Sequence, residues 1–210
     1  MASIGIMGGT FNPIHIGHIE IAKAAYEQFP LDEIWFMPNH TPAYKSDEEL
    51  VSGQHRMAMI ALAIQGIPHF RTDDFELKRE GPTYTAETFN LLKKQYPSDT
   101  FYFIMGADSL DYFEKWKQPE DIVHAATVLV APRGTEDASE LQDKIDKLND
   151  KYGRDSFERI ECRQIPCSSS EIRKRLQQKE PARPGEETTA EQLYVPDSVY
   201  NYIMENHLYR

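Results

Sequence analysis

A short apolar strand that runs into two glycines and then into a helical pattern constrains this fold more than any other feature. Residues 3–7, SIGIM, are predicted to form a buried strand, and Gly8 and Gly9 follow at once. From Ile14 onward, apolar residues recur at helical spacing. A strand, a glycine turn and a helix in this order are typical of an α/β sheet, in which ligands bind at the carboxyl ends of the strands.

The rest of the chain repeats this alternation. Apolar strands are predicted at 32–38, 100–106 and 126–132, with a further strand within 69–79 and an edge strand at 158–166. Helices are predicted at 52–67, 83–97, 107–116, 138–153, 168–179 and 195–209. The pattern predicts the α/β class: a Rossmann-like, open, mainly parallel sheet with helices on both faces. We expect one domain over 1–210, with a small C-terminal helical part at about 168–210.

Bulk properties limit the expected partners. The 210 residues are 40% hydrophobic, enough for one full-sized core, and the formal net charge is −11. Proteins that hold nucleic acid usually carry a basic face, so nucleic acid is not an expected partner. No apolar run approaches the roughly 20 residues that cross a bilayer, and no leader pattern precedes the first strand. We therefore expect no membrane partner and a cytoplasmic location, and the sequence leaves homo-oligomerisation open.

Two further segments carry weaker signals. Cys162 and Cys167 are not spaced as a C-x-x-C zinc or redox pair, so reduced thiols are expected. Residues 179–192, KEPARPGEETTAEQ, are rich in Pro, Glu and Thr without periodicity. They predict a surface loop, which is either a neutral insertion, the simpler interpretation, or a lid.

The first turn, GGTFNPIHIGH at 8–18, has the composition of a phosphate site. Gly8 and Gly9 let the backbone approach a phosphate, and Thr10 offers a hydroxyl group. The start of the following helix adds free N–H groups and the positive end of the helix dipole. A glycine pair after a strand is common by itself, but the eleven residues together indicate a nucleotide.

The two histidines of this turn lie three residues apart. On a helix, His15 and His18 project from one face, with Gly17 keeping that face low. Two imidazole donors aimed at a phosphate stabilise the charge that develops in phosphoryl transfer. A His-x-x-His pair also suits a metal ion, and single histidines are usually structural, so the assignment depends on the whole turn.

The turn resembles the GGTFDPxHxGH signature of the nucleotidylyltransferase superfamily, relatives of the class I aminoacyl-tRNA synthetases, which share the HIGH tetrapeptide. The second superfamily signature, an Ile or Val before two Ser, a Ser or Thr, two further residues and Arg, resembles CSSSEIR at 167–173. The resemblance implies that His15, His18 and Arg173 are catalytic, with Arg173 neutralising the leaving pyrophosphate. It implies an ATP site that includes Gly8, Gly9, Thr10, Phe11, Ser168 and Ser169. Without the resemblance, the serines would be an ordinary helix cap.

Four internal segments resemble the bacterial nicotinate-nucleotide adenylyltransferases. They are DEIWFMPNHTPAYK (32–45), REGPTYTAET (79–88), FYFIMGADS (101–109) and KWKQPEDI (115–122). That family joins ATP and nicotinate mononucleotide into deamido-NAD and pyrophosphate, and Mg²⁺ is expected with the ATP. With no dedicated Ser–His–Asp or Cys–His set in the sequence, the acceptor phosphate is expected to attack the α-phosphate directly.

The resemblance also implies roles for residues in these segments. Gly106 and Asp108 are expected in the nucleotide pocket, with Asp108 on a ribose or on the acceptor, and Arg133 is expected near the adenosine. Trp116 is expected to stack on the pyridine ring. Thr85 is expected to hold the nicotinate carboxylate, and Asn39 and Lys45 to approach the acceptor phosphate. Taken alone, Trp116 is equally well read as a core residue or, between Lys115 and Lys117, as a partly exposed one. Lys45 taken alone reads as a surface charge.

The chain departs from the family pattern at three places. Asn12 replaces the usual Asp, Pro132-Arg133-Gly134 replaces Arg-Pro-Gly, and the 179–192 loop is longer than usual. Asn12 loses the charge and is a poor candidate for a base or a metal ligand. Three rivals stay open: a pantetheine-phosphate adenylyltransferase, an enzyme that prefers nicotinamide mononucleotide, and a non-catalytic nucleotide-binding regulator.

Overall fold

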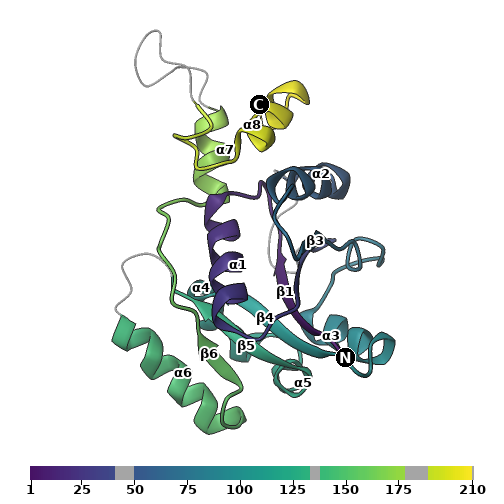
Figure 1. Cartoon of the computed structure of the whole chain (residues 1–210), viewed down its shortest axis with the longest axis vertical. Helices are drawn as coiled ribbons and strands as arrows, with labels where there is room; N and C mark the ends of the chain where they lie inside the picture. Colours follow the sequence, from purple (N-terminus) through teal and green to yellow (C-terminus); the bar gives the residue numbers. More distant parts are fainter. Residues whose placement is uncertain (41–49, 133–137, 178–188, 210) are drawn as a thin grey trace.

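Six parallel strands form one sheet at the centre of the computed structural model (Figure 1). The structure describes residues 1–40, 50–132, 138–177 and 189–209. The strand order is β3-β2-β1-β4-β5-β6, and each pair of neighbours is parallel. The strands are β1 (Ser3–Gly9), β2 (Glu33–Pro38), β3 (Phe70–Thr72), β4 (Thr100–Gly106), β5 (Ala126–Ala131) and β6 (Phe157–Arg159). This confirms the predicted Rossmann-like sheet.

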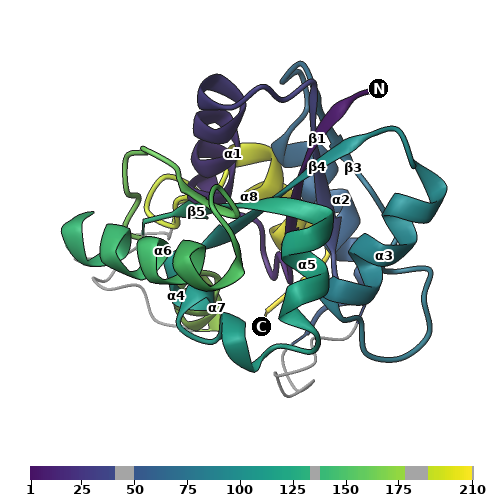
Figure 2. The ribbon, with the colours of Figure 1, turned by 90° about the horizontal axis from the view of Figure 1, so that it is seen from below.

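Apolar residues on both faces of each central strand explain why the sheet is covered on two sides. In β4, Phe103 and Met105 belong to one buried cluster and Ile104 to the other, as side-chain alternation along a strand requires. Helices α1 (Ile16–Gln28), α2 (Gly53–Ala63), α7 (Ser169–Gln177) and α8 (Asp197–Glu205) contribute to one cluster. Helices α3 (Thr85–Gln95), α5 (Pro119–Ala125) and α6 (Ala138–Tyr152) contribute to the other. Figure 2 shows α1 and α3 on opposite sides of the strands.

The order of the strands reverses between β1 and β4. Chain connections leave these two adjacent strands in opposite directions, so a crevice opens beyond their carboxyl ends. The C-terminal helices α7 and α8 lie together at one end of the molecule in Figure 1. The backbone N–H of Ile16, at the start of α1, donates to the carbonyl oxygen of Tyr194 (2.8 Å). The C-terminal part therefore packs against the first βα turn.

The structure differs from the predicted elements in three places. The helix predicted at 107–116 is a four-residue helix, α4 (Ala107–Leu110), followed by a 3-10 turn, η2 (Phe113–Lys115). Helix α5 was not predicted; it has seven residues, too few to show a period, and begins after Gln118 in the left-handed conformation (φ 52°).

The remaining difference is a short strand. The edge strand predicted at 158–166 pairs over Phe157–Arg159 only, whereas the strand predicted within 69–79 is confirmed as β3 (Phe70–Thr72). Beyond β3, the Asp73 carboxylate accepts the N–H of Phe75 (2.9 Å), a local turn that ends the pairing. The predicted 179–192 loop lies outside the described residues up to 188. No helix in the described segments is long and apolar enough to span a bilayer.

Candidate active site

The first βα turn bends sharply at Phe11. This residue has a φ of 50°, which is uncommon without glycine, and its ring is 2% exposed. The Phe11 ring packs edge-on against His18, with ring centroids 5.1 Å apart. The backbone N–H of Asn39, just after β2, donates to the carbonyl oxygen of Gly9 (3.0 Å). A buried aromatic anchor and a cross-strand hydrogen bond thus hold the turn in place.

The two histidines are brought together as predicted. The backbone N–H of His15 donates to Nδ1 of His18 (3.2 Å), and the two rings lie 3.7 Å apart. Because Nδ1 accepts this hydrogen bond, a neutral His18 carries its proton on Nε2. Nε2–H is then the group that can donate to a ligand.

Gly17 leaves room for the His15 ring beside it. A Cβ atom at Gly17 would lie 3.0 Å from Nδ1 of His15 and 3.3 Å from Sγ of Cys167. The same thiol lies 3.3 Å from Nδ1 of His15. Cys162 and Cys167 are both free thiols, as predicted, but this contact between Cys167 and His15 was not foreseen. The two residues are 152 positions apart, so spacing could not reveal it.

A cavity of about 340 Å³, here called the histidine cavity, opens in front of this turn. It is lined by most of the residues expected at the ATP site: Gly8, Thr10, Phe11, Gly106, Asp108, Ser168 and Ser169. His15 and His18, which are expected to be catalytic, line it as well. The other wall is the segment after β6, which includes Cys162, Arg163 and Gln164 and leads to Cys167 of the second signature. Residues 162–165 gave no sequence signal of a site because their pattern predicts a strand.

A second cavity of about 320 Å³, the tryptophan cavity, lies beside the first. Its wall contains Gly9, Asn39, Thr85 and Trp116. Gly9 lines this cavity and not the histidine cavity, so its expected role at the ATP site stays a prediction. The two cavities are neighbours because they share five lining residues: Gly8, Thr10, Met105, Gly106 and Ser109.

Gly106 stands where the cavities meet. A Cβ atom added there would have no protein atom within 4 Å, so packing does not explain the glycine. A side chain would instead project into space that a ligand can occupy. Ser109, three residues on, lines both cavities and was missed although it lies in the segment 101–109 that carried the resemblance.

The amino terminus of α3 forms one side of the tryptophan cavity. Thr85 is the first residue of this helix, and Tyr84, Thr85 and Thr88 all line the cavity. The first turn of a helix carries free N–H groups and a partial positive charge, which suit a carboxylate. Trp116 closes the opposite side, half-buried, with its ring 6.1 Å from that of Phe103. Trp116 is therefore partly exposed and not a pure core residue, and it presents an aromatic surface to the cavity. Its expected stacking on the pyridine ring stays a prediction.

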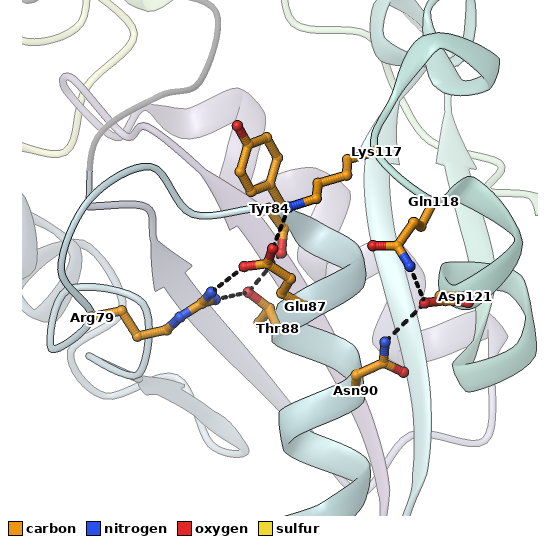
Figure 3. A network of polar contacts seen from close by, with 8 residues as sticks. All are labelled: Arg79, Tyr84, Glu87, Thr88, Asn90, Lys117, Gln118 and Asp121. Carbon is orange, nitrogen blue, oxygen red and sulfur yellow. Dashed lines mark hydrogen bonds and ion pairs between the residues drawn. The ribbon is translucent and has the colours of Figure 1, made fainter.

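A network of charged groups holds the rim of this cavity (Figure 3). Glu87 accepts from Lys117 (2.6 Å) and from Arg79 (2.8 Å), and these interactions lower the pKa of the Glu87 carboxyl. The Lys117 ammonium also lies over the Tyr84 ring, 4.3 Å from its centre. The network joins the segment before α3, helix α3 and the segment after Trp116. Exposed ion pairs of this kind contribute little to stability, so their effect is to orient the rim.

Glu76 lies deeper in the same wall. Its carboxylate accepts the hydroxyl proton of Thr88 (2.6 Å), and Thr88 in turn accepts from Arg79 (2.9 Å). Loss of hydration raises the pKa of the Glu76 carboxyl, which the hydrogen bond from Thr88 partly opposes. No sequence signal indicated that Glu76 is shielded from water, because an isolated glutamate in a polar segment is usually exposed.

The second predicted signature begins α7 and contacts the first turn. Ser168 accepts the N–H of Glu171 (3.2 Å), so it caps the helix as well as lining the histidine cavity. Ser169 donates to the carbonyl oxygen of Pro13 (2.9 Å), and Nη1 of Arg173 donates to that of Asn12 (2.9 Å). Arg173 lines neither of these cavities, and the Nη1 hydrogen bond connects it to the backbone of the turn.

Asn12, which departs from the family pattern, is a buried structural residue. Its side-chain oxygen accepts from the Tyr209 hydroxyl (2.8 Å) and the Val51 N–H (3.3 Å). Burial raises the pKa of the Tyr209 phenol, which keeps this group a hydrogen-bond donor at neutral pH. Lys45 and Arg133 lie outside the described residues. Among the residues that are described, no group of three or more His, Cys, Asp and Glu side chains is arranged to hold a metal ion.

Comparisons with known proteins give the family. The cytidylyltransferase-like family model matches residues 6–175. A probable nicotinate-nucleotide adenylyltransferase of Lachnoclostridium phytofermentans is 42% identical, with all of both chains covered. The nicotinate-nucleotide adenylyltransferase of Bacillus subtilis is 35% identical, with 100% of this chain and 99% of its own length covered.

Solved structures agree on the fold. Nicotinic acid mononucleotide adenylyltransferase of Plasmodium falciparum, complexed with NaAD, has a TM-score of 0.76 at 23% identity, covering 100% of this chain and 98% of that one. Its complex with APC has the same TM-score at 22% identity and the same coverage. With the family model over most of its length and full-length relatives above 30% identity, the chain belongs to the nicotinate-nucleotide adenylyltransferases.

Proposed function

We propose that this chain transfers the adenylyl group of ATP to nicotinate mononucleotide, releasing pyrophosphate and deamido-NAD. The observation that carries the proposal is the pair of cavities that meet at Gly8 and Gly106, one lined by the histidine pair and the other by Trp116. A reaction between two nucleotides needs two adjacent sites of different chemistry. The names of the full-length relatives support the same reaction.

ATP is placed in the histidine cavity. Gly17 at the positive end of the α1 dipole and the hydroxyl of Thr10 suit its phosphates. Ser168 and Ser169 at the start of α7 suit the far end of the triphosphate. Nε2–H of His18 donates to the phosphate oxygens as charge develops. Arg173 lies one turn into α7 and is proposed to leave its contact with Asn12 in order to neutralise the leaving pyrophosphate.

Nicotinate mononucleotide is placed in the tryptophan cavity. Trp116 offers a face for the flat pyridine ring, and the amino terminus of α3 with the Thr85 hydroxyl suits the carboxylate. Asn39 lies nearer the first turn, on the side of the acceptor phosphate, and Lys45 is expected there from the resemblance. Donors arranged for a carboxylate lose partners when a carboxamide is bound, so nicotinamide is discriminated against.

The reaction is proposed to be a direct displacement. The acceptor phosphate oxygen attacks the α-phosphorus of ATP, the bond to the bridging oxygen breaks, and pyrophosphate leaves with the electron pair. The protein contributes positioning and charge stabilisation by His15 and His18. Mg²⁺ enters as part of the ATP substrate, because the phosphates can supply most of its oxygen ligands. We propose that the adenylyl transfer takes place in the cytoplasm.

The test is pyrophosphate release with MgATP and three acceptors in parallel: nicotinate mononucleotide, nicotinamide mononucleotide and phosphopantetheine. Turnover with the nicotinate acceptor, at least about 100-fold more efficient than with the amide, is expected. Equal turnover with both pyridine nucleotides would remove the assigned role of Thr85 and α3. Turnover only with phosphopantetheine would replace the acceptor, and ATP binding without turnover would favour a regulator.

A further inference from the structure

Arg56, on α2, is a charged residue that is 1% exposed, and it is the largest fully buried side chain among the described residues. Its guanidinium donates to backbone carbonyl oxygens of three separate segments. The distances are 2.9 Å to Thr10, 2.8 Å to Asn39 and 3.2 Å to Val51. A fourth carbonyl, that of His40, accepts at 3.2 Å.

The partners of this guanidinium are unusual for a buried charge. Buried arginines normally face a carboxylate, yet within the described residues every oxygen that accepts from Arg56 is uncharged. Loss of hydration lowers the pKa of Arg56, although arginine stays charged at neutral pH. An isosteric apolar residue would avoid this cost of burial. The charge and the fork-shaped set of donors therefore need another explanation.

The three segments explain the geometry. Thr10 lies in the first turn and lines both cavities, whereas Asn39 follows β2 and lines the tryptophan cavity. Val51 precedes α2 and also donates to Asn12 of the turn. Arg56 lines neither of these two cavities, although it lines a third one beside α2, so its effect on the two sites passes through the segments it holds. Nη1 of Arg56 also lies 3.5 Å from the side-chain oxygen of Asn39. The amide oxygen of Asn39 thus faces Arg56, and its NH₂ group points away from the guanidinium and can donate to a ligand.

We infer that Arg56 is a positioning residue: it fixes the segment that holds the acceptor phosphate against the turn that holds the phosphates of ATP. This inference rests on the proposed function. In-line attack requires the reacting oxygen within about 3–3.5 Å of the α-phosphorus, and a displacement of 1 Å can cost about 100-fold in rate. The rigid fork of arginine joins both sides at once, which the single ammonium of lysine does not.

The experiment compares Arg56→Lys and Arg56→Met with the wild type in steady-state assays, with calorimetric titration of each substrate and with thermal melts. Arg71→Lys is the matched control, because Arg71 is an exposed arginine on β3 that lines neither cavity and stacks on Trp35. For Arg56→Lys we expect kcat to fall about 10-fold and the KM for nicotinate mononucleotide to rise about 5-fold. The Kd for ATP alone should change less than about 3-fold. For Arg56→Met we expect kcat to fall about 100-fold.

The outcomes separate this inference from a role in stability alone. If Arg56→Met does not fold, the split between kcat and the two substrate affinities in Arg56→Lys still decides. Unchanged kcat and KM in folded Arg56→Lys, or equal losses for both substrates that follow the melting temperature, would overturn the inference. Wild-type enzyme is assayed beside the variants: absence of turnover there would contradict the proposed function, while the acceptor Kd would still report on Arg56.

Discussion

The two cavities are built in different ways. The wall of the histidine cavity comes mainly from two continuous stretches, residues 7–21 and 162–170, and much of its chemistry is backbone and helix start. The tryptophan cavity takes its wall from six segments between Ile6 and Ile122, cross-linked by side chains such as Glu87 and Lys117. A phosphate site can be built from one turn because it needs N–H groups, whereas an aromatic acid needs a face, a carboxylate site and a shape.

The largest expected effect comes from breaking the histidine cavity. His18→Ala removes the Nε2–H donor and should lower kcat about 10³-fold, with the KM for the acceptor changed less than about 2-fold. Steady-state kinetics with both substrates varied would measure this. His124→Ala, at an exposed position on α5, is the control. A loss of acceptor binding equal to the loss of kcat would show that the cavities are not separable.

Breaking the tryptophan cavity should have the opposite signature. Trp116→Ala removes the aromatic face, and stacking contributes about 1–3 kcal/mol per base, so the acceptor KM should rise about 10- to 100-fold. The Kd for ATP, measured by calorimetry, should stay within about 2-fold. Trp116→Phe keeps a ring and should recover most of the affinity. An equal rise in the ATP constant would place Trp116 outside the acceptor site.

These first two predictions test regions that the sequence revealed unequally. The first turn and the α/β class follow from contiguous patterns, since strand, glycines and histidines are neighbours in the chain. Thr85 and Trp116 were found only by resemblance, because residues 31 positions apart meet through folding. Arg56 and Tyr209 gave no signal: a lone arginine in a helix and a tyrosine near the chain end usually lie on the surface. The length of β6 was overestimated because alternation persists in a segment that lines a cavity.

A smaller effect should follow from removing the hydrogen bond between Tyr209 and Asn12, which supports the turn that lines the histidine cavity. Tyr209→Phe removes the hydroxyl that donates to Asn12, and loss of a buried hydrogen bond should lower the free energy of unfolding by about 1 kcal/mol. Denaturant titration measures it, with Tyr112→Phe as control because Tyr112 is 59% exposed. The KM for ATP should rise about 2-fold. Equal stability of the two variants would remove the proposed support of the turn by the chain end.

The smallest effect concerns Glu76, in the wall of the tryptophan cavity, and depends on pH. Glu76 has a raised pKa in the folded protein, so the folded chain binds its proton more tightly, and stability falls as pH rises from the ordinary value of 4.5 through the folded value. Glu76→Gln lacks this dependence and should melt higher than the wild type near pH 8, with the difference shrinking as pH falls. Melts from pH 4.5 to 8, with Glu80→Gln as control, test this. A difference that grows toward low pH would contradict the assignment.

The contact between Cys167 and His15 raises the question of whether a side chain of the protein takes up the adenylyl group during the reaction. One stereochemical measurement answers it directly. The central claim is that nucleotides in two adjacent cavities react with each other, with no adenylyl group passing through the protein. ATP made chiral at the α-phosphorus with sulfur, turned over with nicotinate mononucleotide, reports the number of displacements. The account predicts inversion of configuration in the deamido-NAD product. Retention would contradict it, since two displacements would require an adenylylated residue, with Cys167 and His15 the first to examine.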